Sequence, residues 1–240
     1  MRPLADCRLY TFVDTAYLQG RAPETLAQQL CDGGSDLIQL RAKHSTPDEI
    51  RALAERILPV TRRAGVGLVI NDHLDVARTV GAEFCHLGQE DFFEAGYQRV
   101  AEIRKPKAEG RRPKAGTRPS KGESQGAKAD GEALRPTLRI GLSTHAPEQA
   151  RRALAAGADY IAIGPVYATP TKPKARPVTL DYVNWAAAHV TVPWFAIGGI
   201  NLETIEAVLA AGAKRVCVVS AILNAPDVAK ACAEFRRRLG

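Results

Sequence analysis

The sequence has no hydrophobic run near the roughly 20 residues that cross a bilayer, and its first residues lack the apolar core of a signal peptide. Its five cysteines are odd in number and scattered, without a CxxC pair or a Cys/His spacing typical of zinc sites. Most of them fall in apolar segments, where a free thiol packs as a small hydrophobic group. These absences argue against a membrane protein or a disulfide-rich secreted protein and predict a cytoplasmic location.

The sequence also lacks a recognisable arrangement for covalent catalysis, since no Ser-His-Asp or Cys-His constellation is apparent. His86 alternates within an apolar segment and is expected in the core. His189 ends a helical stretch, where a cation is favoured. The other three histidines follow predicted strands, but no pair has zinc spacing: His44, His73 and His145.

The positive charge is concentrated in one segment. The chain has a formal net charge of +7, and residues 104–136 alone hold ten Lys/Arg and four Asp/Glu, so the other 207 residues carry only +1. The segment contains five Gly, four Pro, one Leu and no aromatic residue. Because it cannot bury enough apolar area to offset its ordering entropy, we predict a disordered, low-complexity basic insertion. A salt-sensitive tether for polyanions is the alternative, but without aromatic side chains no specific nucleic-acid partner is expected.

One local pattern occurs four times along the chain. In each copy a helical stretch ends at a glycine, and a short apolar strand begins three residues later. The four glycines are Gly34, Gly81, Gly157 and Gly212. Because glycine suits the left-handed residue that ends a helix, each copy marks a helix-to-strand junction. The strands predicted after these junctions and between them are 8–13, 37–40, 67–71, 84–87, 139–143, 160–163, 194–197 and 215–218.

Eight strands that alternate with helices suit either a closed (β/α)8 barrel or a doubly wound sheet. The segments between the strands carry helical signals, for example the capping sequence Thr46-Pro47-Asp48-Glu49. Repeats along the whole chain and a length of 240 residues favour the barrel. We therefore predict an α/β protein with a single (β/α)8 TIM barrel domain over residues 1–240. The insertion 104–136 precedes the fifth strand, on the face away from the C-terminal ends of the strands, where the functional residues of this fold lie.

The first polar cluster at these strand ends follows the strand 37–40. Because side chains alternate along a strand, Gln39, Arg41 and Lys43 should share one face. Two cations and an amide are unfavourable to bury without a ligand, so the cluster indicates a site for an anionic group.

Two carboxylates follow the next two strands. Asp72 and Asp91 should converge, and such a pair suits Mg²⁺, which prefers oxygen ligands and keeps several waters. The alternative is that Asp72 only caps the helix that begins near Leu74. Neighbouring Arg41, Lys43 and Asn71 favour the metal, since cations beside a carboxylate-bound Mg²⁺ suit a diphosphate.

A second anion site is indicated after the last two strands. Gly198-Gly199-Ile200 lets the backbone approach a ligand closely, and Val219-Ser220 adds a hydroxyl and a backbone N–H one unit later. Each motif alone also suits an empty turn, and together they indicate a phosphate. The nearby loop 166–177, with Thr169-Pro170-Thr171-Lys172, is either an ordinary linker or a mobile substrate cover, and its two hydroxyls and ammonium favour the cover.

Seven motifs occur in an order that resembles the thiamine phosphate synthase family, whose (β/α)8 enzymes join the two halves of thiamine phosphate. The resemblance runs from about Leu9 to Leu239, outside the insertion. The motifs are Gln39-Leu40-Arg41-Ala42-Lys43, Ile70-Asn71-Asp72, Gly88-Gln89-Glu90-Asp91, Gly141-Leu142-Ser143-Thr144-His145, the segment 164–172, Ile197-Gly198-Gly199-Ile200 and Val219-Ser220-Ala221-Ile222.

The resemblance implies a transferase that condenses 4-amino-2-methyl-5-(diphosphooxymethyl)pyrimidine with a thiazole phosphate, releasing diphosphate in a dissociative, Mg²⁺-assisted displacement. It implies a pyrimidine diphosphate site at Gln39, Leu40, Arg41, Ala42, Lys43, Asn71, Ser143 and Lys172. It implies a Mg²⁺ site at Asp72 and Asp91, and a thiazole phosphate site at Thr169, Pro170, Thr171, Gly199, Val219 and Ser220. The catalytic contribution is assigned to Arg41, Lys43, Ser143 and Lys172.

Three departures and alternatives accompany this interpretation. Ala42 stands where the family usually has a polar residue, but alternation places it on the other face from Arg41, so little effect is expected. A thiazole tautomerase of the same barrel type would use a proton-transferring residue such as His145 and would not need the diphosphate site. A non-catalytic protein that binds phosphate metabolites or polyanions is the third hypothesis. The sequence leaves the oligomeric state open, a homo-oligomer included.

Overall fold

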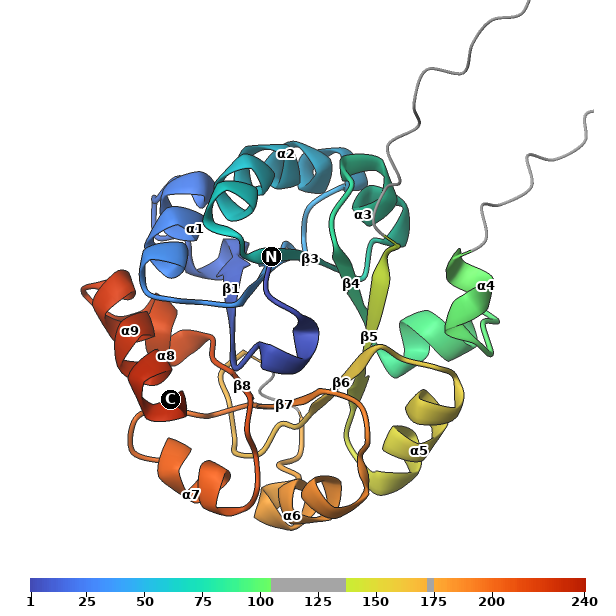
Figure 1. Cartoon of the computed structure of the whole chain (residues 1–240). Helices are drawn as coiled ribbons and strands as arrows, with labels where there is room; N and C mark the ends of the chain where they lie inside the picture. Colours follow the sequence, from blue (N-terminus) through green and yellow to red (C-terminus); the bar gives the residue numbers. More distant parts are fainter. Residues whose placement is uncertain (105–136, 172–174) are drawn as a thin grey trace, which may run out of the picture.

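Eight parallel strands pair in sequence order and close into a barrel in the computed structural model, which describes residues 1–104, 137–171 and 175–240 (Figure 1). The strands are β1 (Leu9–Asp14), β2 (Leu37–Arg41), β3 (Gly67–Asn71), β4 (Phe84–Leu87), β5 (Arg139–Thr144), β6 (Tyr160–Ile163), β7 (Trp194–Ile197) and β8 (Val216–Cys217). The TIM barrel predicted from the repeats is thereby confirmed.

Helices form an outer ring around the strands, as Figure 1 shows. They are α1 (Pro23–Asp32), α2 (Pro47–Ala64), α3 (Leu74–Val80), α4 (Val100–Arg104), α5 (Pro147–Ala155), α6 (Thr179–His189), α7 (Ile205–Ala210), α8 (Ser220–Leu223) and α9 (Val228–Leu239). Short turns of other helix types add η1 (Leu4–Asp6), η2 (Thr15–Tyr17) and the π-helical η3 (Glu90–Glu94). Among the described residues, none of these helices has the length and apolar character to span a bilayer.

The local signals in the sequence correspond to the observed junctions. Thr46 caps α2, and the reciprocal bonds with Glu49 complete a capping box. All four repeat glycines have positive φ, between 71° and 97°. A residue with a side chain is strained in that conformation, which explains why glycine recurs at these positions.

One strand is shorter than the sequence predicts. β8 covers Val216–Cys217 rather than 215–218, because only these two residues pair with both β1 and β7. Beyond them, the Val218 N–H still donates to the Tyr10 carbonyl oxygen on β1. The early end of β8 frees the backbone at Val219 and Ser220 to turn into α8 at the C-terminal end of the barrel.

Aromatic side chains fill the interior of the barrel. Tyr10, Phe84, Tyr160 and Phe195 are fully buried, and the rings of the other three lie edge-to-face with Tyr160. Gly141 makes room for one of them, since a Cβ there would lie 2.1 Å from Cζ of Tyr160. This packed layer closes the barrel beneath its C-terminal mouth.

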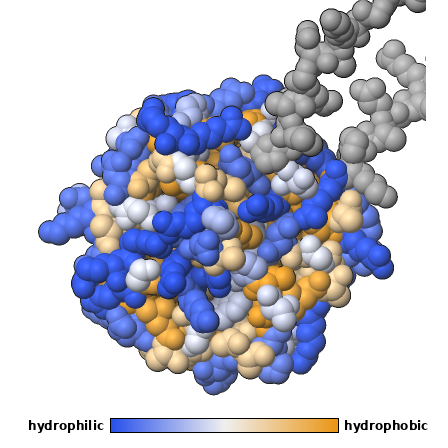
Figure 2. All heavy atoms as spheres, viewed as in Figure 1, coloured by the Kyte–Doolittle hydropathy of each residue, from blue (hydrophilic) through white to orange (hydrophobic). Residues whose placement is uncertain are grey.

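The N-terminal ends of the strands are covered by η1, which lies across the middle of the barrel in Figure 1. Figure 2 shows mostly hydrophilic residues on the surface in the same view. Arg104, the last residue of α4, pairs with Asp159 just before β6 at 2.6 Å. The insertion 104–136 therefore begins at the N-terminal ends of the strands, as the sequence predicts. Its residues 105–136 lie outside the described part of the chain.

Candidate active site

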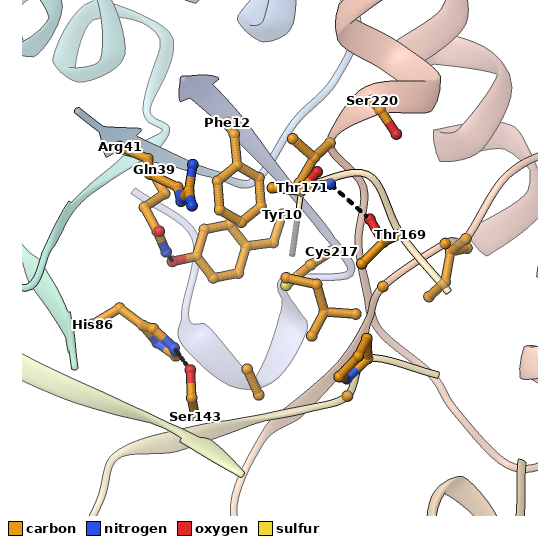
Figure 3. Close-up of a pocket in the computed structure, with 18 of the residues that line it drawn as sticks. Tyr10, Phe12, Gln39, Arg41, His86, Ser143, Thr169, Thr171, Cys217 and Ser220 are labelled. Atoms are coloured by element: carbon orange, nitrogen blue, oxygen red, sulfur yellow. Dashed lines mark hydrogen bonds between the residues drawn. The ribbon is translucent and has the colours of Figure 1, made fainter. Parts of the chain in front are cut away.

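A hollow of about 850 Å³, part of it open to solvent, lies at the C-terminal mouth of the barrel (Figure 3). It collects most of the polar residues that the sequence places at strand ends. Those lining it are Gln39, Arg41, Asn71, Ser143, Thr169, Thr171, Gly199, Val219 and Ser220. Residues from several different strands and the loops that follow them thus converge on one cavity, the usual position of a TIM-barrel active site.

Four other predicted residues of the substrate sites lie elsewhere, and a fifth is not described. Leu40 and Ala42 are buried in the hydrophobic core; alternation along β2 turns Leu40 away from the cavity, and Ala42 directly follows the strand. Lys43 does not line the cavity with Gln39 and Arg41: β2 ends at Arg41, so the alternation does not extend to it, and it is exposed. Pro170 is exposed and does not line the cavity, and Lys172 lies outside the described residues.

Arg41 is held in the wall of the cavity by a buried carboxylate. Its guanidinium donates to Asp14 Oδ2 at 2.6 Å, and the two side chains are only 13% and 1% exposed. Residues 14 and 41 are direct partners in the β1–β2 register. Asp14 also accepts the N–H of Ala16, so this carboxylate is occupied on both oxygens and fixes the direction of Arg41.

The predicted carboxylate pair lies beside the cavity, in a hollow shared by Asp72 and Asp91. Burial raises the pKa of the Asp72 carboxyl, and the charge of Asp91 raises it further, while Lys43 and a hydrogen bond from Asn71 act in the opposite direction. Asn71 Nδ2 lies 2.5 Å from Asp72 Oδ2 and also lines the cavity, so it connects the two hollows. Gly88 N–H donates to Asp91 Oδ2.

A tight turn sets the direction of Asp72. Its φ is +62°, and the N–H of His73 donates to the Asn71 carbonyl at 2.8 Å across it. This is a γ-turn, a strained conformation for a residue with a side chain. Helix α3 begins at Leu74 with His73 as its N-cap, and no side chain caps it. The alternative of Asp72 as a helix cap is therefore wrong.

The donor set of this pair fits a magnesium ion. Within the described part of the chain, neither Asp72 nor Asp91 forms an ion pair with a Lys or Arg, and no third Asp, Glu, His or Cys joins them as a potential ligand. Two adjacent carboxylates repel each other, and a divalent cation would relieve that repulsion. Mg²⁺ takes one or two carboxylates and fills its other positions with water or phosphate oxygens.

The opposite side of the cavity is built from backbone. Gly198 and Gly199 follow β7 with φ of 102° and 66°. A Cβ on Gly199 would lie 2.6 Å from the Ala168 carbonyl oxygen and from Tyr167 Cβ, so only glycine fits against the loop after β6. On that loop, Thr171 N–H donates to Thr169 Oγ1 at 3.4 Å, a bond drawn in Figure 3.

The sequence interpretation missed several residues of the cavity, among them Tyr10, Phe12 and His86. His86 is buried, as expected, yet its Nε2 lies 2.9 Å from Ser143 Oγ, which Figure 3 also shows. Alternation along β1 and β4 was the signal that could have found them, since it points every second side chain into the barrel.

Comparison with known proteins agrees with this geometry. The family model for thiamine monophosphate synthase matches residues 9–108 and 122–222. The chain belongs to this family. The match interrupts at 109–121, inside the predicted insertion.

Individual relatives cover most of the chain. A thiamine-phosphate synthase of Thermus thermophilus is 42% identical over 208 residues, which are 86% of this chain and 84% of the relative. That of Lawsonia intracellularis is 33% identical over 235 residues, 98% and 93% of the two chains. The structure of a thiamine phosphate pyrophosphorylase from Pyrococcus furiosus superposes with a TM-score of 0.75 at 25% identity, covering 98% of this chain and 96% of the other. The chain is thus an enzyme of the thiamine-phosphate synthase type, a transferase of thiamine biosynthesis.

Proposed function

We propose that this barrel condenses 4-amino-2-methyl-5-(diphosphooxymethyl)pyrimidine with a thiazole phosphate, giving thiamine phosphate and diphosphate with the assistance of Mg²⁺. One observation carries the proposal beyond the family. The mouth has two unlike anion-suited regions, a cation beside a carboxylate pair on β2–β4 and a glycine loop after β7. Two such regions suit two differently charged substrates.

The pyrimidine diphosphate is assigned to the first region. Arg41 presents a fixed guanidinium there, and Gln39 and Asn71 offer amides on the same side of the cavity. Lys43 is close enough to lower the pKa of Asp72 by its charge, so it adds positive potential at the edge of this region. A diphosphate has enough oxygen acceptors for all these donors.

Asp72 and Asp91 would hold the Mg²⁺ ion, which when bound neutralises charge on the diphosphate as it departs. The protein's own task is to keep the two carboxylates together. The γ-turn at Asp72 and the N–H of Gly88 toward Asp91 serve that task.

The thiazole phosphate is assigned to the second region. Gly199 packs closely against Tyr167 and Ala168 and lines the cavity, as do Val219 and Ser220. Thr169 and Thr171 add hydroxyls from the loop after β6. Backbone N–H groups and hydroxyls suit the single phosphate of the thiazole partner.

The reaction needs little proton transfer from the protein. Loss of diphosphate leaves a cation stabilised by the aminopyrimidine ring, and the thiazole nitrogen then attacks it. Arg41, Lys43, Ser143 and Lys172 are assigned to stabilising the leaving group, and the mouth aligns the two substrates.

The proposal is tested by following thiamine phosphate with purified protein and synthetic substrates. We expect product only when both substrates and Mg²⁺ are present, and loss of product after chelation that added Mg²⁺ restores. Turnover that continues undiminished under chelation would refute the magnesium part. Product from a thiazole phosphate alone, as a tautomer, would refute the condensation.

A further inference from the structure

A chain of hydrogen bonds crosses the interior of the barrel directly under the cavity. Gln39 Nε2 donates to Tyr10 Oη at 2.5 Å, and Tyr10 Oη lies 3.4 Å from Tyr160 Oη. Tyr160 Oη lies 3.2 Å from Nδ1 of His86, and Nε2 of His86 lies 2.9 Å from Ser143 Oγ. The five side chains come from β2, β1, β6, β4 and β5, so the chain connects the β2 wall to the β5 wall. Figure 3 shows its two ends, Gln39 beside Tyr10 and His86 beside Ser143.

The packing fixes the middle of this chain. Tyr160 is fully buried, with its ring edge-to-face against Phe84 and Phe195, and Gly141 leaves the space that the ring fills. Burial raises the pKa of Tyr10 and of Tyr160 well above the ordinary tyrosine value, so both hydroxyls keep their protons at any physiological pH. Neither hydroxyl can therefore act as an anionic acceptor.

The donor in each hydrogen bond of this chain can be assigned in turn, starting from Gln39. Gln39 can only donate from Nε2, so Tyr10 Oη accepts there and turns its own proton toward Tyr160 Oη. Tyr160 then has its proton available for Nδ1 of His86. A neutral imidazole that accepts at Nδ1 carries its hydrogen at Nε2, and this hydrogen points at Ser143 Oγ.

We propose that His86 is a positioning residue, held by Tyr160 in the Nε2–H tautomer so that it donates to Ser143 Oγ and directs the Ser143 hydroxyl proton into the cavity. This inference rests on the proposed function in one respect. The acceptor of the Ser143 hydroxyl proton is taken to be a phosphate oxygen of the pyrimidine diphosphate. With Nδ1–H instead, Nε2 would take the serine proton and Ser143 would offer the substrate only lone pairs. The tautomer thus decides whether Ser143 is a donor or an acceptor toward the substrate.

The tautomer is measured directly in the unmodified protein. Long-range ¹H–¹⁵N correlation spectra of the ¹⁵N-labelled chain at about pH 8.5, above the ordinary imidazole pKa, distinguish Nδ1–H from Nε2–H. The His86 signals are identified by their loss in His86→Gln. We expect Nε2–H in the wild type and a shifted Nδ1 resonance in Tyr160→Phe. An Nδ1–H tautomer, or an imidazolium with both nitrogens protonated, would overturn the proposal.

Steady-state kinetics test the consequence for Ser143. His86→Phe should lower kcat by roughly 10- to 100-fold, the usual effect of one lost hydrogen bond to a charged group, with little change in KM. His86→Gln carries an amide N–H at about the reach of Nε2 and should recover most of that loss. In a Ser143→Ala background, His86→Phe should lower kcat little further, because the partner is already gone.

The control is Tyr182→Phe. Tyr182 is buried like Tyr160, and its hydroxyl bonds to Thr144 Oγ1 and the Ala146 carbonyl oxygen, outside the chain of hydrogen bonds. It should leave kcat unchanged. Equal fold-losses from His86→Phe with and without Ser143, in folded variants with a wild-type thermal midpoint, would contradict the proposal. The spectra need no substrate, so their result is independent of the proposed function.

Discussion

Asp72 directly follows β3 and Asp91 lies in η3 after the neighbouring strand β4, and their carboxyl groups lie close enough for the charge of Asp91 to raise the pKa of Asp72. Two like charges in one partly buried hollow oppose the fold unless a proton or a cation joins them. Binding of a divalent ion is therefore expected to stabilise this arrangement.

Replacing either carboxylate by its amide should separate catalysis from folding. Asp72→Asn and Asp91→Asn are each expected to lower kcat/KM by about 10²-fold or more, as lost electrostatic elements usually do. The same variants should lose the rise in thermal midpoint that Mg²⁺ with diphosphate gives the wild type, because the ion no longer binds. Thermal melts and initial rates measure the two effects.

The matched control for these variants is Asp48→Asn, at a carboxylate that is 86% exposed on α2. It should change neither the rate nor the Mg²⁺-dependent shift. Near-wild-type rates in both Asp72→Asn and Asp91→Asn would show that the pair is not the metal site.

The pair of Arg41 and Asp14 predicts a loss of stability as well as of activity. Arg41→Ala leaves the Asp14 carboxylate, 1% exposed, without its partner, and should lower the free energy of unfolding by about 3–5 kcal/mol. Urea denaturation measures this change. Arg56→Ala is the control, since its pair with Glu24 is exposed to solvent and should contribute little to stability. A similar small loss in both variants would mean that Arg41 does not compensate a buried charge.

The glycine loop after β7 predicts a selective effect on one substrate. Gly199→Ala adds a Cβ that meets Tyr167 and Ala168 at 2.6 Å, so the loop must shift. The KM for thiazole phosphate should rise by roughly 10- to 100-fold, as small misplacements of binding groups do, with the KM for the pyrimidine diphosphate nearly unchanged. In contrast, Gly20→Ala has the same kind of positive φ, 80°, but open space around it, and should leave both KM values unchanged. An equal rise in both KM values for Gly199→Ala would argue against a separate thiazole phosphate region.

Removing residues 105–135 should leave the enzyme active. The described segment before the insertion ends at Arg104 beside Asp159, near the N-terminal ends of the strands, whereas the cavity is at their C-terminal ends. A chain in which a short Gly/Ser linker replaces 105–135 should form thiamine phosphate at close to the rate of the full chain. If it folds but loses activity, the insertion takes part in catalysis, contrary to this account.

Local signals made the barrel predictable from the sequence. The four repeat glycines all have positive φ where a helix ends, so the repeat marks these junctions in the sequence. Alternation along β2 placed Gln39 and Arg41 on one face, because both residues lie within the strand. The same rule failed for Lys43, which follows the end of the strand.

Contacts between residues far apart in the sequence could not be predicted in the same way. Asp14 meets Arg41 only through the β1–β2 register, and Tyr160 meets His86 across the barrel interior, 74 positions away in the chain. The γ-turn at Asp72 also depends on a hydrogen bond between its flanking residues rather than on a turn motif. The two contacts between strands depend on how the strands register and close into the barrel, which single-residue patterns do not encode.

Diphosphate release, measured with each substrate alone and with both together in Mg²⁺, tests the central claim most directly. The account predicts rapid release only with both substrates, one diphosphate for each thiamine phosphate formed, and a rate reduced by about 10²-fold or more in Arg41→Ala. Equal release from the pyrimidine diphosphate alone, or no release with both substrates, would contradict the proposed condensation.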